Sequence, residues 1–253
     1  MRLKETLQRV PNMRLAIISD IHGNLEAFSQ VLADIDRAEI DGIASLGDNI
    51  GYGPDPEEVV RLIRERSIPS VMGNHELAVV DTTCLDCMNP SARQSLVLTK
   101  QRLSPGTVDY IDTLTHSMTF HKSLCVHGCP PDSVITYLFQ LTTSQFKELF
   151  LAMEEEICFV GHTHYPQIIS FDGEELASLP LSEGELTLQK DLQYIINVGS
   201  VGQPRDGNNN AKYVIWDTSL QRIEMKFIPY DIATTARKIL EVGFPESNAT
   251  RLW

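Results

Sequence analysis

The chain has 253 residues, of which 42% are hydrophobic and 22% are charged, and 21 Lys and Arg residues against 34 Asp and Glu residues give a formal net charge of −13. This composition is ordinary for a globular protein of one large or two small domains, and no apolar run approaches the ~18 residues that a membrane span needs. The acidic balance lacks the positive field on which non-specific nucleic-acid binding depends, so we expect neither membrane insertion nor such binding.

The start of the chain resembles a loosely attached arm more than a targeting signal. Residues 1–12 carry charges among their apolar positions and lack the unbroken apolar stretch of a secretory signal. We therefore expect an N-terminal extension over 1–12, a single domain over 13–253, a cytoplasmic location and reduced cysteines. Cys84 and Cys87 have the spacing of a zinc or redox pair, but no second pair completes a four-cysteine zinc site.

The N-terminal half alternates short apolar runs with amphipathic helical patterns. Residues 15–18 predict a buried strand, and residues 24–40 predict a helix with one apolar face. A second strand follows at 43–46, and the sequence from Asp55 to Glu58 starts a helix, with proline at its first position and acidic residues in its first turn. A third strand is predicted at 68–72. This βαβαβ order predicts a parallel sheet.

The pattern changes in the middle of the chain. Residues from about 82 to 117 carry more helix than strand signals and predict a helical insert. Further helices are predicted at about 144–153 and 231–241. The remaining apolar runs are short and are separated by Gly, Asn and Asp, which predicts a second, more antiparallel sheet. Its predicted strands are 124–126, 157–160, 167–171, 194–198, 213–216 and 222–228.

Short polar strings stand where predicted strands end and loops begin. They are Asp20-Ile21-His22, Gly47-Asp48-Asn49, Gly73-Asn74-His75-Glu76, His127-Gly128 and Gly161-His162-Thr163-His164. Five of the seven histidines of the chain lie in them. Because the carboxyl ends of parallel strands open onto one crevice, strings far apart in the sequence are expected to converge there. Taken singly, each string has a structural alternative, such as a helix cap for Asp20, turn chemistry for Asp48 or a packed core position for a histidine.

The donor atoms of these strings suit divalent metals. The candidate ligands are Asp20, His22, Asp48, Asn74, His127, His162 and His164. Imidazole nitrogens with carboxylate and amide oxygens, and no thiolate, suit Mn, Fe, Zn, Ni or Co. Seven donors are too many for one ion, whereas one shared carboxylate divides them into two sites. Two ions ~3.5 to 4 Å apart lower the pKa of a bridging water and stabilise both ends of a displacement at phosphorus.

The order of these strings resembles that of the calcineurin-like metallophosphoesterases, over Met13 to at least Arg205. The family order is Asp-x-His, Gly-Asp, Gly-Asn-His-Asp/Glu, His and Gly-His-x-His, and every position is filled here. The resemblance implies an α/β fold, a four-layer αββα sandwich with two facing mixed β-sheets. It also implies two divalent metal ions, with Mn favoured. By motif, Asp20, His22 and His164 hold one metal, Asn74, His127 and His162 hold the other, and Asp48 bridges them.

His75 is set apart from the metal ligands. The resemblance implies that this histidine lies beside the metals, contacts the phosphate and protonates the leaving oxygen as the catalytic acid. An imidazole with an unperturbed pKa near ~6.5 suits that role at neutral pH. Glu76 is a candidate for orienting the ring, and a purely structural histidine is the alternative.

Three further residues are candidates for substrate binding. Arg205 is the last residue of a loop that follows a predicted strand. Its guanidinium is expected either to contact a phosphate oxygen or to face water. Tyr52 follows the bridging aspartate and is expected either to stack on an aromatic leaving group or to form a structural turn. Asn24 is expected to donate to the substrate or to cap the following helix.

The expected substrate class follows from one position at which this chain differs from related enzymes. Protein Ser/Thr phosphatases of this superfamily carry an arginine soon after the bridging aspartate, whereas this chain reads Asp48-Asn49-Ile50-Gly51. The closer resemblance is to compact prokaryotic phosphodiesterases and diadenosine-tetraphosphatase-like sequences. The hypothesis is a dinuclear phosphoesterase that hydrolyses a phosphodiester or small nucleotide through a metal-bound hydroxide. The alternatives are a phosphomonoesterase, including a protein phosphatase, and a catalytically silent metal-binding scaffold. Oligomeric state stays open.

Overall fold

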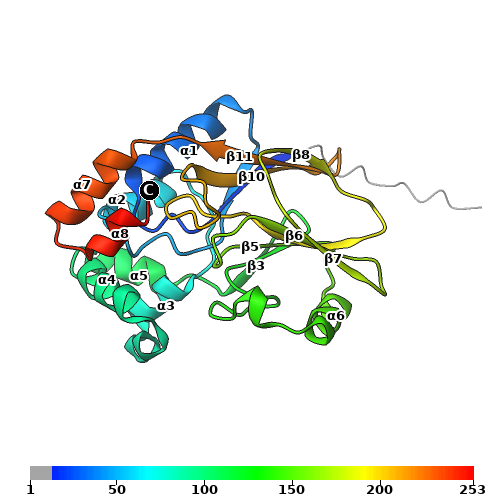
Figure 1. The fold of residues 1–253 in the computed structure, drawn as a ribbon, viewed down its shortest axis with the longest axis horizontal. Coiled ribbons are helices and arrows are strands. Elements are labelled where there is room, and N and C mark those ends of the chain that lie inside the picture. Colours follow the sequence, from blue (N-terminus) through cyan, green and yellow to red (C-terminus); the bar gives the residue numbers. More distant parts are fainter. Residues whose placement is uncertain (1–12) are drawn as a thin grey trace, which may run out of the picture.

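The computed structural model describes residues 13–253, and the extension expected at 1–12 lies outside the described residues. Two β-sheets face each other in the middle of the molecule, and helices lie on their outer sides, with α1 (Leu25–Arg37) and α6 (Thr143–Ala152) on opposite sides (Figure 1). This arrangement confirms the predicted four-layer αββα sandwich with two mixed sheets. Within the described residues, no helix is both long and apolar enough to cross a membrane.

The first sheet joins strands from both ends of the chain. Its order is β2 (Gly42–Ser45), β1 (Arg14–Ile18), β10 (Ala211–Asp217), β11 (Arg222–Ile228) and β8 (Gly184–Thr187). β1 and β2 are parallel, as predicted, while β1, β10, β11 and β8 pair in antiparallel fashion. The prediction that the C-terminal strands form a sheet of their own is therefore wrong. Apolar periodicity identifies a strand but not its partner, and β10 pairs with β1 from about 200 residues away in the sequence.

The second sheet contains the remaining strands. Its order is β3 (Ser117–Phe120), β4 (Ser123–Val126), β5 (Ile157–Val160), β9 (Gln193–Asn197), β6 (Gln167–Phe171) and β7 (Leu176–Pro180). β4, β5 and β9 are parallel, so this sheet is less antiparallel than predicted. The sequence prediction missed β3, β7 and β8, because none of these strands contains a buried residue that would mark it as a core strand.

The predicted third strand at 68–72 is reduced to two isolated bridges. Ser70 pairs with Ser45 and Val71 pairs with Thr115, both in parallel. Pro69 has no N–H to donate, and the chain enters α3 (Asn74–Val80) three residues after Val71, so a longer ladder does not form. The strand position is nevertheless what delivers the Gly73 to Glu76 string to the end of the first sheet.

Besides α1, α3 and α6, the described residues form further helices and two 3₁₀ turns. Their bounds are α2 (Pro56–Glu65), the 3₁₀ turn η1 (Thr82–Cys87), α4 (Pro90–Lys100), α5 (Pro105–Asp112), the 3₁₀ turn η2 (Leu138–Gln140), α7 (Ile232–Glu241) and α8 (Glu246–Thr250). η1, α4 and α5 occupy the segment expected to be a helical insert, and they pack on α2 and α3. The α8 helix was not predicted, since it is only five residues long.

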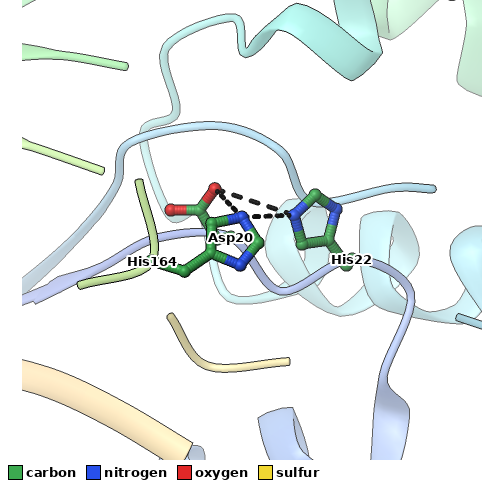
Figure 2. Close-up of side chains that lie close together, drawn as sticks. All are labelled: Asp20, His22 and His164. Carbon is green, nitrogen blue, oxygen red and sulfur yellow. Dashed lines mark hydrogen bonds and ion pairs between the residues drawn. The ribbon is translucent and has the colours of Figure 1, made fainter. Parts of the chain in front are cut away.

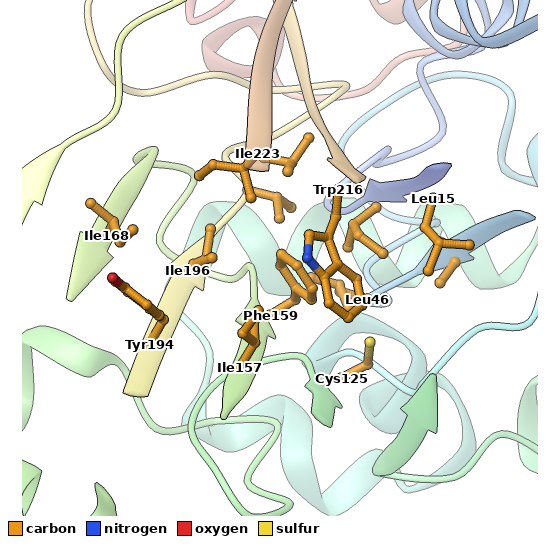
Figure 3. Packing of buried hydrophobic residues seen from close by; sticks show 14 of the residues in the cluster. Leu15, Leu46, Cys125, Ile157, Phe159, Ile168, Tyr194, Ile196, Trp216 and Ile223 are labelled. Carbon is orange, nitrogen blue, oxygen red and sulfur yellow. The ribbon is translucent and has the colours of Figure 1, made fainter. Parts of the chain in front are cut away.

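The core has one apolar layer between the sheets and one beneath each outer helix layer. Trp216 of β10 and Phe159 of β5 meet between the sheets with ring centroids 5.5 Å apart (Figure 3). On the far side of the first sheet, Phe28 of α1 packs with Tyr213 of β10. On the far side of the second sheet, Phe150 of α6 stacks on Phe171 of β6. This rigid framework holds the strand ends in fixed relative positions.

Candidate metal centre

The polar strings converge where strands of both sheets end. Asp20 and His22 follow β1, Asp48 follows β2, His127 follows β4, and His162 and His164 follow β5. Asn74 and His75 begin α3. Asn74 is half-buried, and the other seven of these side chains are no more than 4% exposed. Burying so many ionisable groups together is costly unless they are paired or bind a cation, which already suggests a metal site.

The backbone bends sharply at five of the candidate ligands. Asp20, His22, Asp48, His162 and His164 all have φ values between +51° and +64°. Residues other than glycine rarely adopt this left-handed conformation, which persists only where surrounding structure stabilises it. Here the loops bond to each other, for example from the Asp20 N–H to the Gly47 carbonyl at 3.0 Å and from the His22 N–H to the Asp48 carbonyl at 2.9 Å. Such bends turn each side chain from its strand toward one point.

The first ligand cluster consists of Asp20, His22 and His164 (Figure 2). His164 Nε2 lies 3.1 Å from Asp20 Oδ1 and 3.1 Å from His22 Nε2. His22 Nε2 is 3.7 Å from the same Asp20 oxygen. Asp20 Oδ1 is buried and accepts no hydrogen bond, whereas Asp20 Oδ2 accepts from the His162 N–H at 3.0 Å. One carboxylate oxygen and two imidazole nitrogens are thus directed at a common point.

The second ligand cluster consists of Asn74, His127 and His162. His127 Nε2 lies 3.1 Å from Asn74 Oδ1 and 3.1 Å from His162 Nδ1. Asp48 lies between this cluster and the first, with its Oδ2 3.4 Å from His127 Nε2 and 3.7 Å from His22 Nε2. A single carboxylate oxygen is therefore adjacent to both clusters, which is the position that the sequence predicts for a bridging ligand.

The histidine rings are oriented by backbone carbonyls. His22 Nδ1 donates to the Ile50 carbonyl at 3.0 Å and His127 Nδ1 to the Leu46 carbonyl at 2.9 Å. His164 Nδ1 donates to the Gln203 carbonyl at 2.5 Å, and His162 Nε2 to the Ile135 carbonyl at 3.3 Å. Since a carbonyl only accepts, each of these nitrogens carries the proton. The opposite nitrogen, facing the cluster, then carries the lone pair that a metal needs.

The pKa shifts agree with this assignment for three of the four rings. Burial lowers the pKa of His22 and His164, and burial together with His127 lowers that of His162 to about 3, so these rings are neutral. Burial alone would raise the pKa of Asp48, but the imidazoles around it, above all His127 and His75, lower it well below its usual value. His127 is the exception: burial alone would lower its pKa, but the neighbouring carboxylates, above all Asp48, raise it to about 9, so in the metal-free protein this ring holds a second proton that a metal would displace. Ionised carboxylates beside inward-facing imidazoles form a donor set that fits divalent cations of borderline hardness.

His75 differs from the other histidines of the centre. Its Nε2 lies 3.9 Å from Asp48 Oδ2, but its Nδ1 is buried and makes no hydrogen bond. Its ring packs against Tyr52, with centroids 4.7 Å apart, and burial lowers its pKa to about 4. His75 is near enough to His22 and Asp48 to form a third possible ligand group, yet no carbonyl fixes its tautomer. Either ring nitrogen is therefore free to carry the proton, but the ring is neutral at neutral pH in the metal-free protein, unlike the unperturbed imidazole expected from the sequence.

Glu76 does not orient His75 in the expected way. Its carboxylate accepts from four backbone N–H groups, those of Asp48 at 2.8 Å, Gly73 at 3.0 Å, Asn49 at 2.7 Å and Ile50 at 3.3 Å. The expectation that Glu76 positions the His75 ring is replaced by a role in fixing the loop that carries Asp48. Burial raises the pKa of Glu76 to about 7.

A cavity of about 290 Å³ opens beside the two clusters. Tyr52 and Arg205, both predicted to bind substrate, line it together with Asp48, Asn74 and His75. Asn24 does not line this cavity. Its Oδ1 accepts the Ala27 N–H and its Nδ2 donates to the Gly202 carbonyl, so it caps α1.

One cavity residue, Tyr137, was missed from the sequence. Its ring stacks on His162 with centroids 3.7 Å apart. It lies in an irregular loop between β4 and α6, where no periodic pattern or metal-binding string marks it. Cys84, one of the two cysteines with the spacing of a zinc or redox pair, also lines the cavity.

Comparisons with known proteins place the chain among metallophosphoesterases. The model of the calcineurin-like phosphoesterase superfamily domain matches residues 13–221. The uncharacterized protein MJ0912 of Methanocaldococcus jannaschii is 37% identical over 244 residues, which cover 94% of this chain and 97% of that protein. A metallophosphoesterase structure from Sphaerobacter thermophilus is 38% identical with a TM-score of 0.81, covering 95% of this chain and 98% of that one.

A more distant structure shows how far the fold extends beyond sequence similarity. The hypothetical protein PH1004 from Pyrococcus horikoshii OT3 is 18% identical, covers 95% of this chain and 97% of its own, and superposes with a TM-score of 0.77. With a family model over most of the chain and related proteins of matching length, the resemblance noted in the motif order is confirmed. This chain belongs to the calcineurin-like phosphoesterase superfamily.

Proposed function

We propose that this protein is a dinuclear metal-dependent phosphoesterase that hydrolyses phosphodiesters or small nucleotides. The observation that carries the proposal is the position of Asp48, whose Oδ2 lies within 3.7 Å of an inward-facing nitrogen in each ligand cluster. Asp20, His22 and His164 would hold one ion, Asn74, His127 and His162 the other, and Asp48 both. When bound, such an ion pair activates water and offsets the charge that develops on the phosphoryl oxygens.

The other cavity residues have separate tasks in this proposal. His75 is assigned the proton transfer to the leaving oxygen, since it lines the cavity and its ring is held by packing rather than by a carbonyl. Arg205 is assigned a contact with a non-bridging phosphate oxygen. Its guanidinium donates from Nη2 to Gln203 Oε1 at 2.9 Å, which leaves other N–H groups for the phosphate. Tyr52 supports His22 and His75 by ring contacts with both.

The preference for diesters rests on the charge of the cavity. Among its lining residues Arg205 is the one permanent cation, and no lysine lines it. A phosphodiester carries one negative charge and a phosphomonoester dianion carries two. The two ions would attract either ester, and beyond them a single guanidinium matches the one charge of the diester. The absence of arginine from positions 49–51, directly after Asp48, points in the same direction. Mn is the favoured metal, although the same ligand set accepts Fe, Zn, Ni or Co.

Turnover of two chromogenic esters after metal removal and reconstitution tests the proposal. The chelated protein should hydrolyse bis-p-nitrophenyl phosphate only when Mn²⁺ or another of these ions is restored, and faster than it hydrolyses p-nitrophenyl phosphate. Asp48→Asn should lose this activity and metal, and His75→Asn should lose activity but keep metal. The control Asp109→Asn changes an exposed carboxylate on α5 and should behave as the wild type.

The alternatives predict different results. Faster hydrolysis of the monoester would favour a phosphomonoesterase, including a protein phosphatase, over the proposed diesterase. Absence of metal-dependent hydrolysis of either ester, with both ions bound, would overturn the proposal and leave the metal-binding scaffold.

A further inference from the structure

We propose that the apolar side of the cavity is a subsite for the base of a nucleotide, formed by Leu77, Met88 and Ile135. This inference rests on the proposed phosphoesterase function and names the substrate class more narrowly. The lining of the cavity divides by chemistry, since the residues around the metal centre are polar whereas Leu77, Cys84, Met88, Ala92, Ile135 and Tyr137 are largely apolar. A phosphate at the metal centre would place its ester group against this apolar wall.

The wall comes from three segments of the chain. Leu77 belongs to α3, two residues after His75, and Met88 lies between η1 and α4 in the helical segment 82–117. Ile135 belongs to the loop that precedes η2. The apolar wall therefore includes the helix that carries the proposed acid for the leaving group. A leaving group protonated by His75 would lie within reach of Leu77 and Met88, because all three line one cavity.

The loop that supplies Ile135 is fixed to the metal centre. His162 Nε2 donates to the Ile135 carbonyl at 3.3 Å, and the Tyr137 ring stacks on the His162 ring at 3.7 Å and 20°. Phe139 stacks on Tyr137 from the next position outward, with centroids 4.9 Å apart. Any shift of the loop would disturb a proposed metal ligand, so the wall is held in place before a ligand binds. Such preorganisation favours recognition of a rigid, planar group.

The exposure of the apolar wall and the volume of the cavity both suit a nucleobase. The side chain of Ile135 is 57% exposed although it lines the cavity, so covering it would remove apolar surface from water. Met88 can pack its polarisable sulfur against an aromatic ring. A cavity of about 290 Å³ lies at the lower end of the range for small-molecule sites and suits one nucleotide unit rather than a protein segment.

Two amide side chains distinguish a base from a plain aromatic ring. Asn89 and Gln140 also line the cavity, and in each the amide oxygen accepts a backbone N–H, that of Ala92 at 2.9 Å and that of Tyr137 at 3.1 Å. Because the oxygens are engaged, it is the NH₂ groups that can donate to a ligand. Ring nitrogens and carbonyl oxygens of a nucleobase accept such bonds, whereas a phenyl ring has no comparable acceptor.

Calorimetric binding to the metal-replete protein tests the subsite without relying on turnover. The probes are adenosine 5′-monophosphate, ribose 5-phosphate and phenyl phosphate. The nucleotide should bind about tenfold or more tightly than ribose 5-phosphate, since burial of one apolar side chain against the base is enough for a tenfold effect. It should also bind more tightly than phenyl phosphate, whose ring offers no acceptor to the amides of Asn89 and Gln140. The double variant Met88→Ser/Ile135→Ser should remove this advantage and leave the affinity for ribose 5-phosphate unchanged. Leu151→Ser is the matched control, because Leu151 is 73% exposed on α6 and does not line the cavity.

The outcomes separate this inference from the proposed function. Equal binding of the nucleotide and ribose 5-phosphate would overturn the subsite, as would a double variant that weakens both ligands equally. Phenyl phosphate binding as tightly as the nucleotide would overturn its assignment to a base. If the esters are hydrolysed with Mn²⁺ but the nucleotide has no advantage, the function stands without the subsite. If the nucleotide advantage depends on Met88 and Ile135 but no ester is hydrolysed, the subsite stands without the function.

Discussion

The proton positions of the individual histidines show how the centre is prepared for metal. A neutral ring whose outer nitrogen donates to a backbone carbonyl keeps its inner lone pair available, and His22, His162 and His164 follow this rule. His127 makes the same kind of carbonyl bond, but its pKa is raised to about 9, so it has to release its inner proton when an ion binds. No tautomer change is then required when an ion binds, and the carbonyl partner also restricts rotation of the ring. His75 lacks such a partner, which is consistent with a residue whose protonation changes during a reaction.

Gly51 leaves free the space that the His75 ring occupies. A Cβ at this position would lie 2.0 Å from His75 Nδ1, and the φ of +88° is strained for any other residue. We predict that Gly51→Ala displaces the ring, lowers turnover of the diester at least about tenfold and reduces stability by about 1 to 2 kcal/mol. Turnover assays and urea unfolding measure the two effects.

The control for this prediction is Gly106→Ala. A Cβ there meets nothing within 4 Å, and the position lies in the first turn of α5. Turnover should be unchanged and stability equal or raised by up to about 1 kcal/mol, because alanine favours a helix over glycine. Wild-type turnover in Gly51→Ala would show that the placement of His75 is unimportant for catalysis.

Single residues were predictable where chemistry and position coincided. Asp20, His22 and the Gly161 to His164 string combine metal-binding side chains with the end of an apolar run, so both signals are local in the sequence. Tyr137 gives no such signal, because its role comes from a ring stack with a residue 25 positions away. The cap made by Asn24 had been one of two expectations, and only the contact with Gly202 shows that its amide is fully used.

At the scale of elements, the loop after β2 depends on α3. Glu76, in the first turn of α3, accepts the N–H groups of Asp48, Asn49 and Ile50, which all lie in that loop. These donors are buried, so without the carboxylate they would have no hydrogen-bond partner. Buried N–H groups without a partner lower the stability of the fold. The helix therefore fixes the bridging aspartate as well as supplying Asn74 and His75.

Glu76→Gln tests this dependence. An amide has only one oxygen, so its NH₂ group would face N–H groups that need an acceptor. We predict that the metal-free variant loses about 1 to 3 kcal/mol of unfolding free energy at pH 8 in urea titrations. Glu58→Gln, an exposed change in the first turn of α2, should stay within about 0.5 kcal/mol of the wild type. Equal stability of the two variants would show that Glu76 does not hold the loop.

The positions of helices and strands were predicted better than the pairing between strands. The helices that became α1, α2, α6 and α7 start within about two residues of their expected positions because caps and apolar faces are local. The assignment of β8, β10 and β11 to the first sheet depends on pairings between distant segments, which periodicity does not encode. The prediction of two mixed sheets is therefore correct, whereas the predicted assignment of β10 and β11 to the second sheet is wrong.

At the scale of the whole molecule, the layer between the sheets contains an ionisable group. Cys125 of β4 is fully buried there, next to Trp216 and Leu46 in the same apolar cluster (Figure 3). Burial raises the pKa of its thiol from 9.0 to about 12. The native protein therefore keeps this proton at a pH where the unfolded chain loses it. The associated stability is complete below pH 9 and is lost as the pH rises toward 12.

Replacing Cys125 by alanine tests this coupling across the fold. The stability advantage of the wild type over Cys125→Ala should shrink by about 2 kcal/mol between pH 8 and pH 10.5, at about 1.4 kcal/mol for each unit above the unfolded pKa. Urea unfolding at the two pH values gives the difference. Val126→Ala removes a buried, non-ionisable side chain from the same strand, and its effect should not vary with pH. A constant difference for Cys125→Ala would contradict the assigned pKa shift.

A dinuclear centre requires that Asp48 binds both metal ions, and diffraction from crystals of the Mn²⁺-replete protein tests this most directly. Anomalous scattering at the manganese edge should give two peaks ~3.5 to 4 Å apart. One should lie among Asp20, His22 and His164, the other among Asn74, His127 and His162, with an Asp48 oxygen between them. A single peak, or two peaks without Asp48 as a shared ligand, would contradict the dinuclear centre.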